Sequence, residues 1–238
     1  MLLLFDVDGT LLLRAADAHK EAFHVALHEV FGIEDARAFR VATPGKTDLQ
    51  IAREVLLQAG YGARAIDDRI DALGEAWCRA HAERQPDIAD RVAPGMRDLL
   101  HWLAGQDKVR LSLLTGNLEP IARLKLARAG IGDFFARGQG AFGSDSEDRA
   151  ELPAVARRRA GRRGGEPYPR TRTAVIGDTP LDIACARADG VRAVAVATGP
   201  FTIEDLRAAD DVAADAAGLR GVLARMLWGF SPEPASYT

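Results

Sequence analysis

Short runs of apolar residues without polar alternation recur along the chain, and most of them end in polar side chains. Leu2 to Phe5 is the first run, and others follow at 111–114, 173–176 and 191–197, with a minimal one at 141–143. Unbroken runs of this kind are typical of strands buried on both faces of a parallel sheet. Between the runs, apolar residues recur with helical spacing. The alternation predicts an α/β fold with a Rossmann-like, doubly wound parallel sheet.

The segment after the first strand has a different pattern, because helical stripes continue where a second strand would be expected. Gly32 is placed to end the first of these helices, and Thr47-x-x-Gln50 has the form of a capping box at the start of the second. The three apolar stripes are Phe23, Leu27, Val30 and Phe31; Ile51 and Val55; and Ile66, Ile70, Leu73 and Trp77. We therefore predict an inserted α-helical cap at residues 15–90 and a Rossmann-like core at residues 1–14 and 91–238.

Further helices are expected within the core. One begins after Pro94-Gly95, one runs through Ile121 to Gly130, one extends from Glu147 to about Arg163, and one begins at Pro180, where proline suits the first helical turn. The residues from about Ser231 have the composition of a frayed end.

Composition and charge narrow the range of partners. The 238 residues carry a formal net charge of −3, so no strong field favours a nucleic acid or an anionic membrane surface. No apolar run approaches the roughly 18 residues of a membrane span, and the first run lacks the basic flank of a signal peptide. The two cysteines have no metal-ligand spacing. We expect a cytoplasmic protein, monomeric or homodimeric, that binds neither nucleic acid nor membrane.

Three of the expected strands end in polar residues that meet at one edge of a parallel sheet, where ligands bind in open α/β folds. Asp6 and Asp8 follow the first strand, Thr115 and Asn117 the second, and Asp178 a later one. Residues two apart in an extended segment point the same way, so the first two carboxylates face one side. The pair suggests an aspartate nucleophile, an acid/base neighbour and a divalent cation. The alternative is a polar turn, since Asp-Gly is a common turn former.

The other two strand ends suit a phosphate and a metal ion. Thr115 supplies a hydroxyl, and Gly116 and Asn117 lead into a helix whose N-terminal N–H groups favour an anion. The alternative is an ordinary turn with Asn117 as a helix cap. Asp178 is a hard oxygen ligand that suits Mg²⁺. Asp182 lies in the first turn of the next helix, so we expect it either behind the metal ligands or as the partner in a capping box.

Three stretches of the chain resemble motifs one, two and four of the haloacid dehalogenase-like hydrolase superfamily: Asp6-Val-Asp8-Gly-Thr10-Leu, Thr115-Gly-Asn117 and Gly177-Asp178-Thr-Pro-Leu-Asp182. They occur in the family's order, and the resemblance covers the core along most of the chain. The helical insertion resembles the cap of the subgroup that includes phosphoglycolate phosphatase and β-phosphoglucomutase.

The resemblance implies a role for each motif residue. Asp6 would attack phosphorus and form an aspartyl phosphate, and Asp8 would protonate the leaving oxygen and then activate water. Thr115 would bind the phosphoryl oxygens. Mg²⁺ would be held by Asp6, Asp178 and the backbone carbonyl of Asp8. Dehalogenases of the superfamily lack the second aspartate because a halide needs no proton, so its presence argues for phosphoryl transfer.

The chain departs from the family at motif three, which usually supplies a lysine near the nucleophile and the phosphate. Lys125 is the last lysine in the sequence. Arg149 is the best positional match, and its guanidinium can bind oxygens bidentately. The alternative is a surface arginine paired with Glu147 or Asp148. Lys125 is the fallback, although its position within a helix suggests a solvated side chain.

Lys46 lies in a loop that enters the predicted cap and resembles the loop that reaches toward the active site in this subgroup. We expect it either to contact a phosphate or carboxylate of the substrate or to remain solvated.

The function expected from these features is a Mg²⁺-dependent phosphatase acting on a small phosphorylated metabolite, phosphoglycolate-like or a sugar phosphate. The alternatives are a phosphomutase of the β-phosphoglucomutase type and a non-catalytic member that binds a phospho-ligand or a partner protein.

Overall fold

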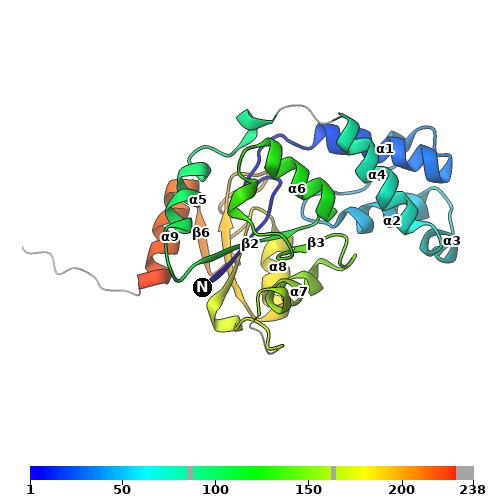
Figure 1. Ribbon diagram of the computed structural model, residues 1–238. Coiled ribbons are helices and arrows are strands. Elements are labelled where there is room, and N and C mark those ends of the chain that lie inside the picture. The colour runs from blue at the N-terminus through cyan, green and yellow to red at the C-terminus, as the bar shows by residue number, and fades with distance from the viewer. Residues whose placement is uncertain (85–87, 162–164, 229–238) are drawn as a thin grey trace, which may run out of the picture.

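The computed structural model describes residues 1–84, 88–161 and 165–228, and its centre is a six-stranded parallel sheet (Figure 1). The strands are β1 (Leu2–Phe5), β2 (Arg110–Thr115), β3 (Ala141–Phe142), β4 (Thr173–Gly177), β5 (Arg192–Val196) and β6 (Asp211–Ala213). Their order is β3-β2-β1-β4-β5-β6, and each strand is parallel to its neighbours. The predicted α/β class with a doubly wound parallel sheet is confirmed.

Helices surround the sheet and extend beyond it. They are α1 (Asp17–Phe31), α2 (Asp48–Gln58), α3 (Ala63–Asp67), α4 (Ile70–Arg84), α5 (Met96–Ala104), α6 (Glu119–Arg128), α7 (Leu152–Arg159), α8 (Pro180–Asp189) and α9 (Ala216–Trp228). Short 3₁₀ turns occur at Ala36–Ala38, Ala89–Arg91, Gly132–Phe134, Arg149–Glu151 and Arg170–Arg172. Within the described part of the chain, no helix is both long and apolar enough to cross a membrane.

Strand β1 occupies the position at which the strand order reverses. Phe5, its last residue, lies opposite Leu113 of β2 and Ile176 of β4. Ligands of doubly wound sheets bind in the crevice beyond the carboxyl ends of the strands at this position. Asp6, the next residue, therefore stands where the topology alone would place a ligand site.

The side chains of β1 alternate between two apolar cores. Leu3 and Phe5 lie in one cluster with residues of α5, α6 and α9, whereas Leu2 and Leu4 lie in a second cluster with residues of α7 and α8. All four side chains are fully buried. Helices on both faces of the sheet explain why this run shows no polar alternation.

Helices α1 to α4 share an apolar cluster to which no described strand residue contributes. Phe23 of α1 stacks on Trp77 of α4, with ring centroids 4.3 Å apart. The cluster also includes Leu118 and Ile121 at the start of α6. Figure 1 shows the four helices grouped at one end of the molecule, beside α6 and away from α5 and α9.

Some predicted helices differ in their boundaries. The stripe from Ile66 to Trp77 covers two helices, α3 and α4, with a break between them. The helix expected from Glu147 instead begins as a 3₁₀ turn, and α7 starts only at Leu152. Pro153 lacks the N–H that a longer helix would use, so it fits only in the first turn. The expected end of this helix near Arg163 and the tail from Ser231 lie outside the described residues.

Candidate active site

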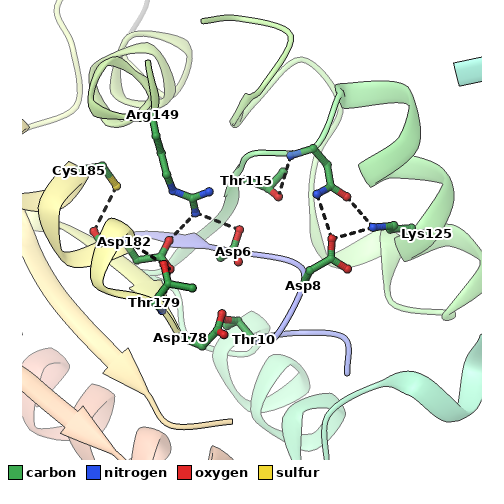
Figure 2. Close-up of polar contacts among 11 residues, drawn as sticks. Asp6, Asp8, Thr10, Thr115, Lys125, Arg149, Asp178, Thr179, Asp182 and Cys185 are labelled. Carbon is green, nitrogen blue, oxygen red and sulfur yellow. Dashed lines mark hydrogen bonds and ion pairs between the residues drawn. The ribbon is translucent and has the colours of Figure 1, made fainter. Parts of the chain in front are cut away.

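The polar strand ends line one cavity of about 290 Å³ at the carboxyl edge of the sheet. Among the residues that line it are Asp6, Asp8, Lys46, Thr115, Gly116, Asn117, Arg149 and Asp178. Asp182 does not line the cavity, but it is buried directly behind this group and contacts Arg149 (Figure 2). The structure thus brings the residues predicted from the sequence into one site.

Three buried carboxylates form an acidic cluster in this site. Asp6, Asp178 and Asp182 each offer an oxygen, and these oxygens lie within 4.8 Å of one another. Burial and the neighbouring carboxylates together raise the pKa of Asp6 to about 7, against the opposing effect of Arg149, and that of Asp178 to about 8. Carboxylates held this close repel one another unless a proton or a cation offsets their charge. Their hard oxygen atoms and high local charge fit a divalent cation of the Mg²⁺ type.

Arg149 supplies one positive charge to this cluster. Its Nη2 donates to Asp6 Oδ1 at 3.1 Å and also to Asp182 Oδ1. The side chain is buried, and Nε has no hydrogen-bond partner in the described part of the chain. The expected alternative, a surface arginine paired with its neighbours, is not what the structure contains, because Glu147 pairs with Arg53 at 2.5 Å.

Asp182 has two partners, one for each of its oxygens. The predicted capping box is present: Asp182 Oδ2 accepts from the Thr179 backbone N–H at 3.0 Å and from the Thr179 hydroxyl at 2.7 Å. Its Oδ1 accepts from Arg149. Asp182 therefore fixes the arginine as well as the start of α8.

Lys125 overturns the expectation of a solvated side chain. It is fully buried, and its Nζ donates to Asp8 Oδ2 at 2.7 Å and to Asn117 Oδ1 at 2.8 Å. Burial tends to raise the pKa of Asp8, but the Lys125 ammonium and its hydrogen bond outweigh this effect and hold the pKa below its usual value. A signal was available in the sequence, because Lys125 is spaced four and three residues from Ile121 and Ala122, on the buried face of α6.

The motif-two residues are arranged around Asp8 and the cavity. The Asn117 side chain donates to Asp8 Oδ2 at 3.0 Å. It does not cap α6, whose first flanking residue is Leu118 and has no side-chain cap. The Thr115 hydroxyl accepts from the Asn117 backbone N–H at 3.3 Å, which leaves its own hydrogen available to a ligand.

Thr10 and Gly9 help to place Asp178, a role that the sequence argument did not assign to either residue. The Thr10 hydroxyl donates to Asp178 Oδ1 at 3.1 Å. Gly9 has φ +88°, and a Cβ at this position would lie 2.2 Å from Asp178 Oδ2. Only glycine accommodates both the backbone conformation and the close carboxylate.

The loop before α2 and the helices α1 and α2 close one side of the site. Asp48 joins them to motif two: its backbone N–H donates to the Gly116 carbonyl at 2.8 Å, and its Oδ2 accepts from the Leu118 N–H at 2.8 Å. Its other oxygen, Oδ1, lies 2.9 Å from His19 Nε2. Lys46, next to this junction, lines the cavity but also pairs with Glu54 at 2.5 Å.

Comparisons with known proteins agree with this geometry. The model of the family described as haloacid dehalogenase-like hydrolase matches residues 3–187. The chain is 30% identical to a phosphoglycolate phosphatase of Rhodospirillum rubrum, over 82% of this chain and 79% of that protein. It is 28% identical to a Dickeya dadantii protein named "Probable phosphatase IndB", over 99% and 98% of the two chains.

Among solved structures, the chain is similar to CbbY of Rhodobacter sphaeroides in complex with xylulose-(1,5)bisphosphate. The TM-score is 0.63 with 20% sequence identity, and the match covers 92% of this chain and 95% of that one. At this identity the likeness concerns the fold.

Proposed function

The chain belongs to the haloacid dehalogenase-like hydrolases and is a phosphatase of that family, and we propose that it is Mg²⁺-dependent and hydrolyses a small phosphate monoester through an aspartyl phosphate on Asp6. The observation that carries this proposal is the placement of Asp6. It follows the central strand, lines the cavity and lies 3.1 Å from a buried guanidinium. No described donor contacts its Oδ2, which leaves that oxygen for the substrate or a cation.

Asp6 and the groups around it can divide hydrolysis into two easier steps. Asp6 attacks phosphorus while Arg149, through donors not used on Asp6 and Asp182, balances the charge on the phosphoryl oxygens. The Thr115 hydroxyl donates to one of these oxygens. Asp8 protonates the leaving oxygen and then accepts a proton from the water that attacks the aspartyl phosphate. This division agrees with the position of Asp6 and Asp8, which both line the cavity.

The acidic cluster fits the metal ion that the family typically uses. We propose that Asp6, Asp178 and the backbone carbonyl of Asp8 hold Mg²⁺, and that Asp182 stays behind them because both of its oxygens already have partners. When bound, the ion would neutralise part of the charge shared by the carboxylates and the phosphoryl group.

Phosphate release from a panel of small esters tests this function. We expect turnover with Mg²⁺ and a loss of about 100-fold or more when EDTA removes the ion, because the carboxylates would then repel the anionic substrate. The panel contains phosphoglycolate, a sugar monophosphate, a sugar bisphosphate and glycerol phosphate. Release would be measured as inorganic phosphate, with the Asp6→Asn variant as the control for contaminating activity.

Each alternative has its own outcome in the same assay. Interconversion of sugar phosphates that needs a bisphosphate and releases little phosphate would identify a phosphomutase. Tight binding of a phospho-ligand without turnover would identify a binding protein. Turnover that survives EDTA would contradict the proposed metal dependence.

Two cations in the cavity support a substrate with a second anionic group. Arg14 and Lys20 line the cavity, and neither forms an ion pair with any described residue. We propose that they face a carboxylate or a second phosphate on the leaving group, and that Lys46 contributes less because Glu54 already pairs with it. The phosphoglycolate phosphatase relative and the bisphosphate in the CbbY structure agree with such a substrate. We therefore expect kcat/KM to be higher for phosphoglycolate than for glycerol phosphate.

We propose that residues 15–90 act as a cap that closes over the substrate. Their own apolar cluster and the Asp48 junction with motif two support this role. Closure would keep bulk water away from the aspartyl phosphate. Only the single water that takes the place of the leaving group would then reach phosphorus.

Gly116→Ala is expected to disturb this closure. A Cβ at residue 116 would lie 2.1 Å from the Lys46 carbonyl oxygen, a backbone atom that can move only with its loop. We expect kcat/KM to fall about tenfold or more while the unfolding temperature changes little, because the active closed form becomes less populated. Gly105→Ala is the matched control, since its Cβ would meet nothing nearer than 3.5 Å. Equal kcat/KM in both variants would contradict a closed catalytic form with this loop contact.

A further inference from the structure

The buried lysine of α6 completes a three-residue arrangement around Asp8, which we call the Lys125 triangle (Asp8, Asn117 and Lys125). Lys125 Nζ lies 2.7 Å from Asp8 Oδ2 and 2.8 Å from Asn117 Oδ1. Asn117 Nδ2 donates to the same Asp8 oxygen at 3.0 Å. Figure 2 shows Asp8 and Lys125 on the opposite side of Asp6 from Arg149. The triangle is therefore a separate arrangement from the acidic cluster and its guanidinium.

Stability alone does not account for a lysine at this position. The Lys125 side chain is fully buried on a helix face whose other buried residues include Ile121, Ala122 and Leu126. Removing an ammonium from water is costly, and replacing a buried ion pair by apolar side chains of similar volume is often neutral or stabilising. A methionine could fill the same space with a straight chain. The benefit of the charge must therefore lie in what it does to Asp8.

The triangle distinguishes the two oxygens of Asp8. Both donors contact Oδ2, whereas Oδ1 has no hydrogen-bond partner in the described part of the chain although it is shielded from solvent. A carboxylate held by two donors at one oxygen has a fixed rotation about its side chain. With this rotation fixed, the Asp8 side chain, which is 31% exposed, keeps one orientation at the cavity that it lines.

We propose that Lys125 is a positioning residue that, with Asn117, holds the Asp8 carboxyl group in the orientation in which it performs the proton transfers of the reaction. This inference rests on the proposed phosphatase function. In the first step an oxygen of Asp6 bonds to phosphorus, the bond from phosphorus to the leaving oxygen breaks, and the proton of the Asp8 carboxyl group moves to that oxygen. In the second step a water bonds to phosphorus, one of its protons moves to the Asp8 carboxylate, and the bond from Asp6 to phosphorus breaks.

Lys125→Met tests the proposal through the leaving group. An alkyl ester releases a strongly basic alkoxide that needs the proton, whereas p-nitrophenyl phosphate releases a weak base that does not. We expect the rate of the first turnover to fall about 100-fold for the alkyl ester that the wild type hydrolyses best, and less than about threefold for p-nitrophenyl phosphate. The measurement is a rapid-mixing experiment on the first turnover, so that the second step does not mask the first. The ratio of the two rates is the readout.

Four further variants, one of them a double substitution, distinguish a positioning role from a general loss of activity. Asp8→Asn should lower the same ratio, and adding Lys125→Met to it should change the ratio little further, because both changes remove one function. Asn117→Ala removes the other donor to Oδ2 and should lower the ratio about tenfold, which provides a second route if Lys125→Met does not fold. Arg157→Met is the matched control, since it removes a buried cation 2.5 Å from Asp189 that does not line the cavity. It should leave the ratio unchanged.

An equal loss for both esters in Lys125→Met and Asn117→Ala would overturn the proposal and leave Lys125 a structural role only. A wild-type enzyme that hydrolyses neither ester would instead contradict the proposed function, so the two failures are distinguishable.

Discussion

Asp6→Asn is expected to reduce phosphate release to background while the chain remains folded. The side chain is buried, and asparagine has nearly the same shape, so the neighbouring contacts can persist with little rearrangement. An amide has no carboxylate oxygen to form the aspartyl phosphate, and it contributes no negative charge to a cation site. Removing a nucleophile on which both steps depend should cost about 10⁴-fold or more in kcat. The loss in kcat is measured as steady-state release of inorganic phosphate from the ester that the wild type hydrolyses best.

Asp6→Asn is also expected to change the stability of the chain, in a direction that depends on pH. Burial raises the pKa of Asp6 from 3.8 to about 7, so the folded chain disfavours the ionised carboxylate. A group of this kind lowers the free energy of unfolding above its ordinary pKa, and the cost disappears once the carboxyl is protonated in both states. Without metal, Asp6→Asn should therefore unfold at a higher temperature than wild type at about pH 8, and the difference should narrow toward about pH 4.

Asp189→Asn is the control for both readouts. Asp189 is also a buried carboxylate, but Arg157 pairs with it at 2.5 Å and it does not line the cavity. We expect this variant to keep its turnover and to lose stability. Retained phosphate release in Asp6→Asn would remove Asp6 from the role of nucleophile.

The sheet and the residues at its carboxyl edge were predictable because both depend on local sequence. A strand buried on both faces is a short apolar run, and parallel topology gathers the ends of such runs at one edge. Asp6, Thr115 and Asp178 could therefore be brought together without knowledge of a single long-range contact. Strand β6 and helix α9 were not predicted, since a three-residue strand has no periodicity and α9 contains Gly218 and Gly221, which weaken a helical signal.

The partners of charged side chains were harder to predict, because they depend on packing between distant segments. Arg149 was identified as the best positional match to motif three, but only the fold determines that it contacts Asp6 rather than Glu147. Lys125 was expected in solvent because lysines in helices usually are. Its burial follows from the face of α6 that packs against the core, and its partner Asp8 is 117 residues away in the chain. Sequence spacing can indicate the face, but not the partner.

Arg149→Ala should lower both the rate and the metal-free stability. It removes the guanidinium that donates to Asp6 and Asp182, in a cluster whose three carboxylates have oxygens within 4.8 Å. Breaking a buried ion pair typically costs about 3–5 kcal/mol, and losing one donor to the developing charge costs about 10²–10³-fold in kcat. Arg149→Lys keeps the charge without the planar fork and should recover part of both losses. Phosphate release and thermal unfolding measure the two effects.

The effect of added Mg²⁺ on the stability of Arg149→Ala shows whether Arg149 acts through its charge or only through packing. If Arg149 and the metal neutralise the same carboxylates, adding Mg²⁺ should stabilise Arg149→Ala more than it stabilises the wild type. Arg157→Ala is the matched control, because it breaks a buried pair of the same kind with Asp189, away from the cavity. It should lose stability, keep its rate and gain no extra stability from Mg²⁺. A near-normal rate in Arg149→Ala would instead assign the motif-three role to another cation, and the buried Lys125 beside Asp8 would be the first to test.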